Sequence, residues 1–135
     1  MPAEVFFDTT ILIYAVTEND PRTPVATELL SVGGTLSIQV LNEFALVARR
    51  KLRMEWDEVR RALFLVRSLC HVPVPLTVRV HEAAIEIAAR YGFHMYDSLI
   101  VAAALDAGCS TLYTEDLHDG QKIEALTVRN PFQTR

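Results

Sequence analysis

The chain has 135 residues, half of them hydrophobic, and we expect residues 1–135 to form a single domain around one core. A formal net charge of −4 and a pI of about 5.5 argue against a protein that coats nucleic acid by bulk positive charge. No apolar run has the length of a membrane span and the first residues do not resemble a signal peptide, so we expect a cytoplasmic protein in which Cys70 and Cys109 are free thiols.

Segments typical of strands and of helices alternate along the chain. Short apolar runs predict strands at 4–7, 35–37, 72–74 and 111–113, with 127–129 as a candidate fifth. Apolar residues at helical spacing predict helices at 10–16, 24–32, 38–50, through the stripe Trp56, Val59, Leu63 and Val66, from Thr77 to Tyr91, and at 96–107. This alternation predicts a mainly parallel sheet of four or five strands with helices on both faces.

Two acidic residues stand where such a sheet forms its sites. Asp8 directly follows the first strand, and Asp116 follows the strand at 111–113 after a short turn. Sites in parallel sheets form beyond the carboxyl ends of the strands. We therefore expect these two carboxylates to lie at the same edge of the sheet.

Two further acids lie on predicted helices without a local cation. Glu43 is at the margin of the buried face of the helix at 38–50, and the positions three and four residues away carry no basic group. Asp97 has only His94 nearby as a partner. Carboxylates beside an apolar core are costly unless something positive compensates them, and a divalent metal ion would do so.

Each acid also has an ordinary interpretation. Asp97 could cap a helix, Asp8 could form an Asx turn, and Asp116 with Asp119 could shape the turn before Gly120. A joint role is the better interpretation, because the predicted sheet brings two of these acids to one edge.

The basic residues are concentrated in one region. Seven of the 13 Lys and Arg residues lie between Arg49 and Arg67. A solvated helical hairpin and a phosphate-binding surface are equally good explanations of this region.

Four short segments resemble the PIN-domain family in order and spacing, and most closely its VapC toxins of bacterial type II toxin–antitoxin pairs. These segments are Asp8-Thr9-Thr10, 37–44 around Glu43, 96–100 around Asp97, and Thr114-Glu115-Asp116-Leu117. The C-terminal segments Gly108-Cys109, Asp119-Gly120-Gln121 and Asn130-Pro131-Phe132 extend the resemblance over essentially the whole chain. Thr10 departs from the pattern, because the family often has Asn there.

The resemblance implies a Rossmann-like α/β/α sandwich and a Mg²⁺- or Mn²⁺-dependent endoribonuclease, in which a metal-activated water hydrolyses RNA. It implies that the metal-binding acids are Asp8, Glu43, Asp97 and Asp116, and that the hydroxyl of Thr114 supports water or substrate. Glu115 and Asp119 are kept as reserve ligands. His118, close to the expected site, could touch substrate, although an exposed surface position is its more ordinary interpretation. A homodimer and a cognate antitoxin protein are implied as well.

Three rival functions remain open at this stage. A PIN-like module could bind RNA or a partner without cutting, although retention of all four acids argues against this. A haloacid-dehalogenase-type phosphatase could use Asp8 as nucleophile, but Thr10 stands where a second Asp is needed. A signalling receiver domain expects paired acids after the first strand, which are lacking here, and a Lys late in the chain, for which Lys122 is the only candidate.

Overall fold

A four-stranded sheet forms the centre of the computed structural model, which describes residues 4–133. The strands are β1 (Val5–Phe7), β2 (Thr111–Tyr113), β3 (Lys122–Ile123) and β4 (Leu126–Arg129), in the order β1-β2-β4-β3. β1 pairs with β2 and β2 with β4 in parallel, whereas β3 runs antiparallel to β4. The prediction of a mainly parallel sheet is confirmed.

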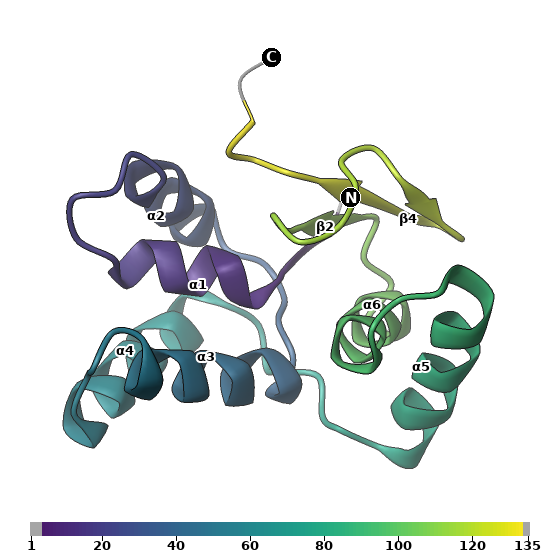
Figure 1. Ribbon diagram of the computed structural model, residues 1–135, viewed down its shortest axis with the longest axis horizontal. Coiled ribbons are helices and arrows are strands. Elements are labelled where there is room, and N and C mark those ends of the chain that lie inside the picture. The colour runs from purple at the N-terminus through teal and green to yellow at the C-terminus, as the bar shows by residue number, and fades with distance from the viewer. Residues whose placement is uncertain (1–3, 134–135) are drawn as a thin grey trace.

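Helices cover both sides of this sheet. Residues 4–133 form α1 (Thr9–Val16), α2 (Thr23–Val32), α3 (Ile38–Arg50), α4 (Trp56–Leu69), α5 (Val78–Tyr91) and α6 (Met95–Asp106). Helices α1 to α4 lie together on one side and α5 and α6 on the other (Figure 1), which is the predicted α/β/α arrangement. α3 also contacts α6, so the two helices that carry Glu43 and Asp97 meet.

Polar residues in the sequence determine where the helices begin and end. The Ser37 side chain accepts a hydrogen bond from the N–H of Val40 at the start of α3, and Thr77 does the same for Val80 at the start of α5. Gly92 ends α5 in the left-handed conformation, with φ of 74°. These caps fix the registers of α3 and α5, and that of α3 determines which face presents Glu43.

Two strand predictions were wrong. Segments 35–37 and 72–74 form only isolated parallel bridges, which join Phe6 to Thr35 and Ser37 to Val74. Extension beyond these bridges fails because Ser37 already caps α3 and because Pro73 has no N–H to donate. The short strand β3, in turn, was not predicted, since two residues are too few for a periodic pattern.

The apolar core lies between the sheet and the helices. Phe6, Phe7, Phe44 and Leu112 are fully buried there. α6 is buried from Ser98 to Ala104, as its continuous apolar sequence predicted. Trp56 was expected in the buried stripe of α4 but is 54% exposed, lying beneath the guanidinium of Arg49. Within residues 4–133, no helix is both long and apolar enough to cross a membrane.

Gly34 should tolerate no side chain. A Cβ atom built there would lie 2.7 Å from Phe7 Cε2 and 2.8 Å from Val5 Cγ2, in the fully packed region beside β1. We expect Gly34→Ala to lower the free energy of unfolding by about 1–3 kcal/mol in chemical denaturation. Gly92→Asn is the matched control, because a Cβ there meets nothing within 4 Å and Asn accepts the left-handed conformation. Equal stability of the two variants would contradict the packing described here.

Candidate active site

Asp8 lies at the end of β1 and caps the start of α1. The register that pairs Phe7 with Tyr113 places the next residues, Asp8 and Thr114, side by side, and the Asp8 N–H donates to the Tyr113 carbonyl at 3.0 Å. The Asp8 side chain is buried; Oδ1 accepts from the N–H of Thr9 at 2.6 Å and Oδ2 from the Thr114 hydroxyl at 2.5 Å. Hydrogen bonds rather than a cation therefore hold this carboxylate.

Thr114 connects Asp8 to Asp116. Its wholly buried hydroxyl donates to Asp8 and accepts from the backbone N–H of Asp116 at 3.0 Å. The intervening Glu115 N–H donates to the Thr10 hydroxyl at 3.3 Å. Thr10, the departure from the usual family pattern, thus binds the turn that carries Asp116 rather than the carboxylate of Asp8.

Glu43 and Asp97 come from the two helices that meet beside the sheet. Both are half-buried, and the Gln39 amide donates to Glu43 Oε2 at 3.1 Å. His94 occupies the N-cap of α6, where its ring accepts from the N–H of residue 96 at 3.3 Å. Capping therefore does not explain Asp97. Asp116 is exposed on its turn.

The four acids act on one another electrostatically. Burial raises the pKa of Asp8 to about 7, against the lowering effect of its hydrogen bonds from Thr114 and Thr9, and the charges of Asp116 and Glu43 raise it further. Burial is also the largest cause of the raised pKa of Glu43, to which Asp97 and Asp116 add. Burial raises the pKa of Asp97. The pKa of Asp116 is raised by partial loss of water around its carboxylate, although the residue as a whole is exposed, and by the charges of Asp97 and Glu115. The four carboxylates thus share one region of negative potential.

Positive charge is scarce around this group. His94 lowers the pKa of Glu43 and of Asp97, and no Lys or Arg within residues 4–133 forms a salt bridge with any of the four acids. The Thr9 hydroxyl beside Asp8 is buried without a hydrogen-bond partner among the described residues. A buried hydroxyl without a partner is a position at which a bound water molecule would lower the free energy.

The donor chemistry suits Mg²⁺ or Mn²⁺, which prefer carboxylate oxygens. As they stand, however, no three His, Cys, Asp or Glu side chains in the described part of the chain are close enough together to hold a metal ion. These carboxylates are of the kind that binds such an ion, and three or more of them could share one only if their side chains moved closer together.

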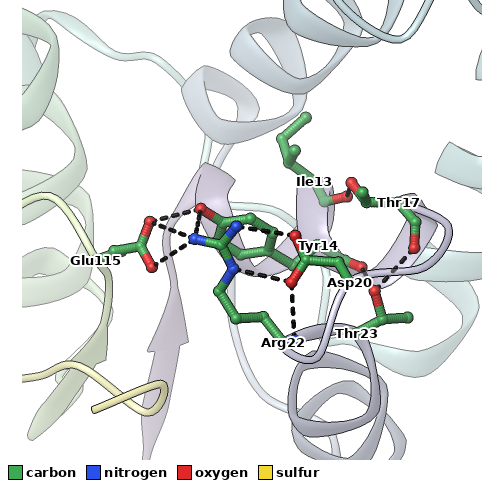
Figure 2. A network of polar contacts seen from close by, with 7 residues as sticks. All are labelled: Ile13, Tyr14, Thr17, Asp20, Arg22, Thr23 and Glu115. Carbon is green, nitrogen blue, oxygen red and sulfur yellow. Dashed lines mark hydrogen bonds and ion pairs between the residues drawn. The ribbon is translucent and has the colours of Figure 1, made fainter.

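Sequence reasoning missed a polar network next to the acids, shown in Figure 2. Glu115 accepts from the Tyr14 hydroxyl at 2.5 Å and from Arg22 Nη1 at 3.2 Å, and Arg22 in turn binds Asp20. The segment that contains Asp20 and Arg22 is typical of a loop in sequence, and nothing in its spacing indicates a partner 93 residues away.

The remaining candidates have other contacts or stay untested. The Glu115 carboxylate, a predicted reserve ligand, is engaged by Tyr14 and Arg22. Asp119, the other reserve ligand, accepts from the N–H of Asn130 at 2.8 Å. His118 is exposed, and its contact with substrate stays a prediction.

Part of the basic region is used within its own helical hairpin. Arg49 donates to the carbonyl of Met54 at 2.9 Å and lies over the Trp56 ring. Arg60 pairs with Asp57 on the exposed face of α4. These contacts support the solvated-hairpin interpretation for two of the seven cations, and RNA binding by the others stays a prediction.

The chain belongs to the PIN-domain family, because the family model of the PIN domain matches residues 5–119. Its fold is similar to that of VapC20 from Mycobacterium tuberculosis, a toxin that cleaves the sarcin–ricin loop, with a TM-score of 0.69, 21% identity and coverage of 84% of this chain and 90% of that one.

Two further solved structures share the fold. A toxin–antitoxin complex from Klebsiella pneumoniae matches with a TM-score of 0.73, 19% identity and coverage of 97% and 100% of the two chains. VapBC2 from Rickettsia felis, bound to a promoter DNA fragment, matches with a TM-score of 0.65 and 20% identity. This match covers 93% of this chain and 97% of that one. No curated protein sequence matches the chain.

The raised pKa of Asp8 makes the metal-free protein less stable at higher pH. The folded site favours the neutral acid, so the stabilising contribution of Asp8 is fully present below 3.8, the ordinary pKa of its carboxyl group, and is lost as the pH rises through about 7. From pH 6 to pH 8 the free energy of unfolding in EDTA should fall by about 1.4 kcal/mol through this group, as urea titrations would measure.

The control for this dependence is a pair of variants. Asp8→Asn should remove most of the slope, while Asp57→Asn, at an exposed ion pair on α4, should keep it. If the free energy of unfolding of Asp8→Asn still falls as steeply between pH 6 and pH 8, a group other than Asp8 causes the pH dependence.

Proposed function

We propose that this chain is a metal-dependent endoribonuclease that acts as the toxin of a type II toxin–antitoxin pair. One observation carries the proposal: the acids Asp8, Glu43, Asp97 and Asp116 come from separate parts of the chain yet lie within one another's electrostatic reach, with no Lys or Arg of residues 4–133 in a salt bridge with them. Membership of the PIN-domain family and the similarity to toxin structures support it.

Asp8, Glu43, Asp97 and Asp116 would hold the Mg²⁺ or Mn²⁺ ion. When bound, the ion would supply an activated water and stabilise the negative charge that builds up at phosphorus. The chain's contribution is to orient the ligands: Thr9 and Thr114 fix the two oxygens of Asp8, and Gln39 fixes one oxygen of Glu43. Each of these oxygens keeps a free lone pair for an ion.

The geometry disfavours the phosphatase alternative. A nucleophilic Asp8 would have to reach a phosphate, but its side chain is only 4% exposed and both oxygens accept hydrogen bonds. Thr10 stands where that mechanism needs a second acid, and its hydroxyl is used by the N–H of Glu115. Asp8 is better suited to hold a cation at the edge of a wider acidic surface.

The proposed antitoxin partner has a candidate docking site between three helices. A groove of about 460 Å³ between α1, α2 and α4 is lined by apolar side chains, with Leu65 and Leu69 exposed in it. Glu58 and Arg61 supply one charge of each sign at its lining. An amphipathic helix of an antitoxin is the occupant that this apolar groove with charges of both signs favours.

A second copy of the chain is the other proposed partner. Leu46 on α3, Ile85 on α5 and Tyr96 on α6 are apolar side chains about half exposed. A homodimer that covers them would remove this surface from water.

Purified protein freed of antitoxin should cleave RNA in Mn²⁺ and stop in EDTA. Asp97→Asn keeps the size of the side chain but removes a charged ligand, so we expect at least a 100-fold loss of single-turnover rate with an unchanged melting temperature. Gel analysis of a defined RNA would measure the rate, with Asp57→Asn as the matched control, because it removes an exposed carboxylate on α4.

Full cleavage by a folded Asp97→Asn protein would refute the metal-site proposal. The toxin assignment has its own test in growth: expression of the wild type should slow growth while Asp97→Asn does not. Equal growth of both strains would count against the toxin role and leave nuclease chemistry standing.

A further inference from the structure

The turn at 114–116 presents two neighbouring carboxylates to different surroundings. The Glu115 carboxylate accepts from Tyr14 and Arg22 on the α1–α2 side (Figure 2). The Asp116 carboxylate is in the field of Asp97 and adds to the raised pKa of Asp8.

Asp116 is positioned through its backbone. Its N–H donates to the Thr114 hydroxyl at 3.0 Å, while its side chain is exposed. The hydrogen bond from the Glu115 N–H to the Thr10 hydroxyl, at 3.3 Å, adds a second contact through the backbone of this turn. The Glu115 side chain supplies a further attachment of this turn, to Arg22 at the N-cap of α2.

Contacts with Asp20 and Tyr14 hold the Arg22 side chain in the orientation in which it binds Glu115. Its Nε and Nη2 donate to the two oxygens of Asp20 at 2.9 and 2.8 Å, and this pairing lowers the pKa of Asp20 to about 2. The guanidinium lies 3.9 Å from the centre of the Tyr14 ring, and its Nη1 donates to the Tyr14 hydroxyl at 2.6 Å. A planar group fixed on two sides in this way is a rigid support.

Tyr14 is equally constrained. Its ring packs edge-on against Phe132 with centroids 5.0 Å apart, and its carbonyl accepts from the Thr23 hydroxyl at 2.8 Å. Burial and the hydrogen bond to Glu115 raise the pKa of Tyr14 to about 12, so its hydroxyl stays a donor at neutral pH.

The contacts disfavour a phosphate-binding role for Arg22. Asp20 and Glu115 carry one negative charge more than Arg22 neutralises, and each of the three guanidinium nitrogens already donates to Asp20, Glu115 or Tyr14. An RNA phosphate that accepted two hydrogen bonds from Arg22 would have to displace one of these partners. The arrangement instead suits a support for the neighbouring turn.

We propose that Arg22 and Tyr14 are positioning residues, which hold Glu115 so that Asp116 is directed toward Asp8 and Asp97 when a divalent ion binds. The inference rests on the proposed function and adds to it two residues outside the acidic set. It also assigns Glu115 a supporting role in place of metal ligation.

Mn²⁺ binding to the whole protein, measured by calorimetry, tests this directly. Tyr14→Phe removes one hydroxyl and Arg22→Lys removes the planar fork, and each should weaken Mn²⁺ binding roughly 10-fold, as outer-shell changes do. Arg79→Lys is the matched control, since its pair with Asp106 lies at the far end of α6 from Asp97. The melting temperatures should change little, because Arg22 is 39% exposed in its ion pairs.

A double-mutant cycle separates positioning from general stability. In the Asp116→Asn background, Arg22→Lys should cause less than a twofold further loss of Mn²⁺ affinity, because its effect passes through Asp116. Unchanged Mn²⁺ affinity in both single variants, or a full further loss in the Asp116→Asn background, would overturn the proposal.

Two further measurements distinguish a failure of the positioning role from a failure of the proposed nuclease function. Amide exchange at Glu115 and Asp116 should be faster in Arg22→Lys and in Tyr14→Phe even without metal, and unchanged exchange would overturn the proposal. A wild-type protein that binds Mn²⁺ but leaves RNA intact would refute the nuclease function while the positioning role stands. A wild-type protein that binds no Mn²⁺ would refute both.

Discussion

The hydrogen bond between Thr114 and Asp8 is the contact on which the site depends. It exists because β1 and β2 pair in parallel with Phe7 opposite Tyr113, so the residues that follow the two strands emerge together. Parallel pairing across more than 100 residues of intervening chain requires helices to cross between the strands. The same helices, α3 and α6, bring Glu43 and Asp97 to that edge.

The buried carboxylate of Asp8 is the least favourable charge of the site when no cation is bound. Asp8 has lost most of its contact with water, and two hydrogen bonds do not fully offset that loss, so its pKa remains raised. Its acidic neighbours increase the penalty instead of relieving it. In the proposed function, a cation bound here would relieve this unfavourable electrostatic energy, which would favour divalent ions over a neutral ligand.

The parallel sheet and the positions of the acids along it were predictable from the sequence. Asp8 and Asp116 follow two short apolar strands, so a parallel sheet alone predicts that they lie at the same edge. Glu43 was a candidate because it lies at the margin of the buried face of α3 and has no basic neighbour on that helix. The bridges at Thr35 and Val74 were mistaken for strands because an apolar run does not reveal how many residues find a partner. The Arg22–Glu115 contact was unpredictable for a related reason: it joins a loop to a turn, and neither has a period that fixes the direction of its side chains.

If the four acids bind one divalent ion together, a crystal structure of the metal-loaded protein will show it, with Mn²⁺ located by its anomalous scattering. We expect a peak at roughly 2.0–2.3 Å from an oxygen of Asp8 and of at least one of Glu43, Asp97 and Asp116, with the others in direct or water-mediated contact. A protein saturated with Mn²⁺ that shows no peak among these four carboxylates, or a peak only elsewhere, would contradict it.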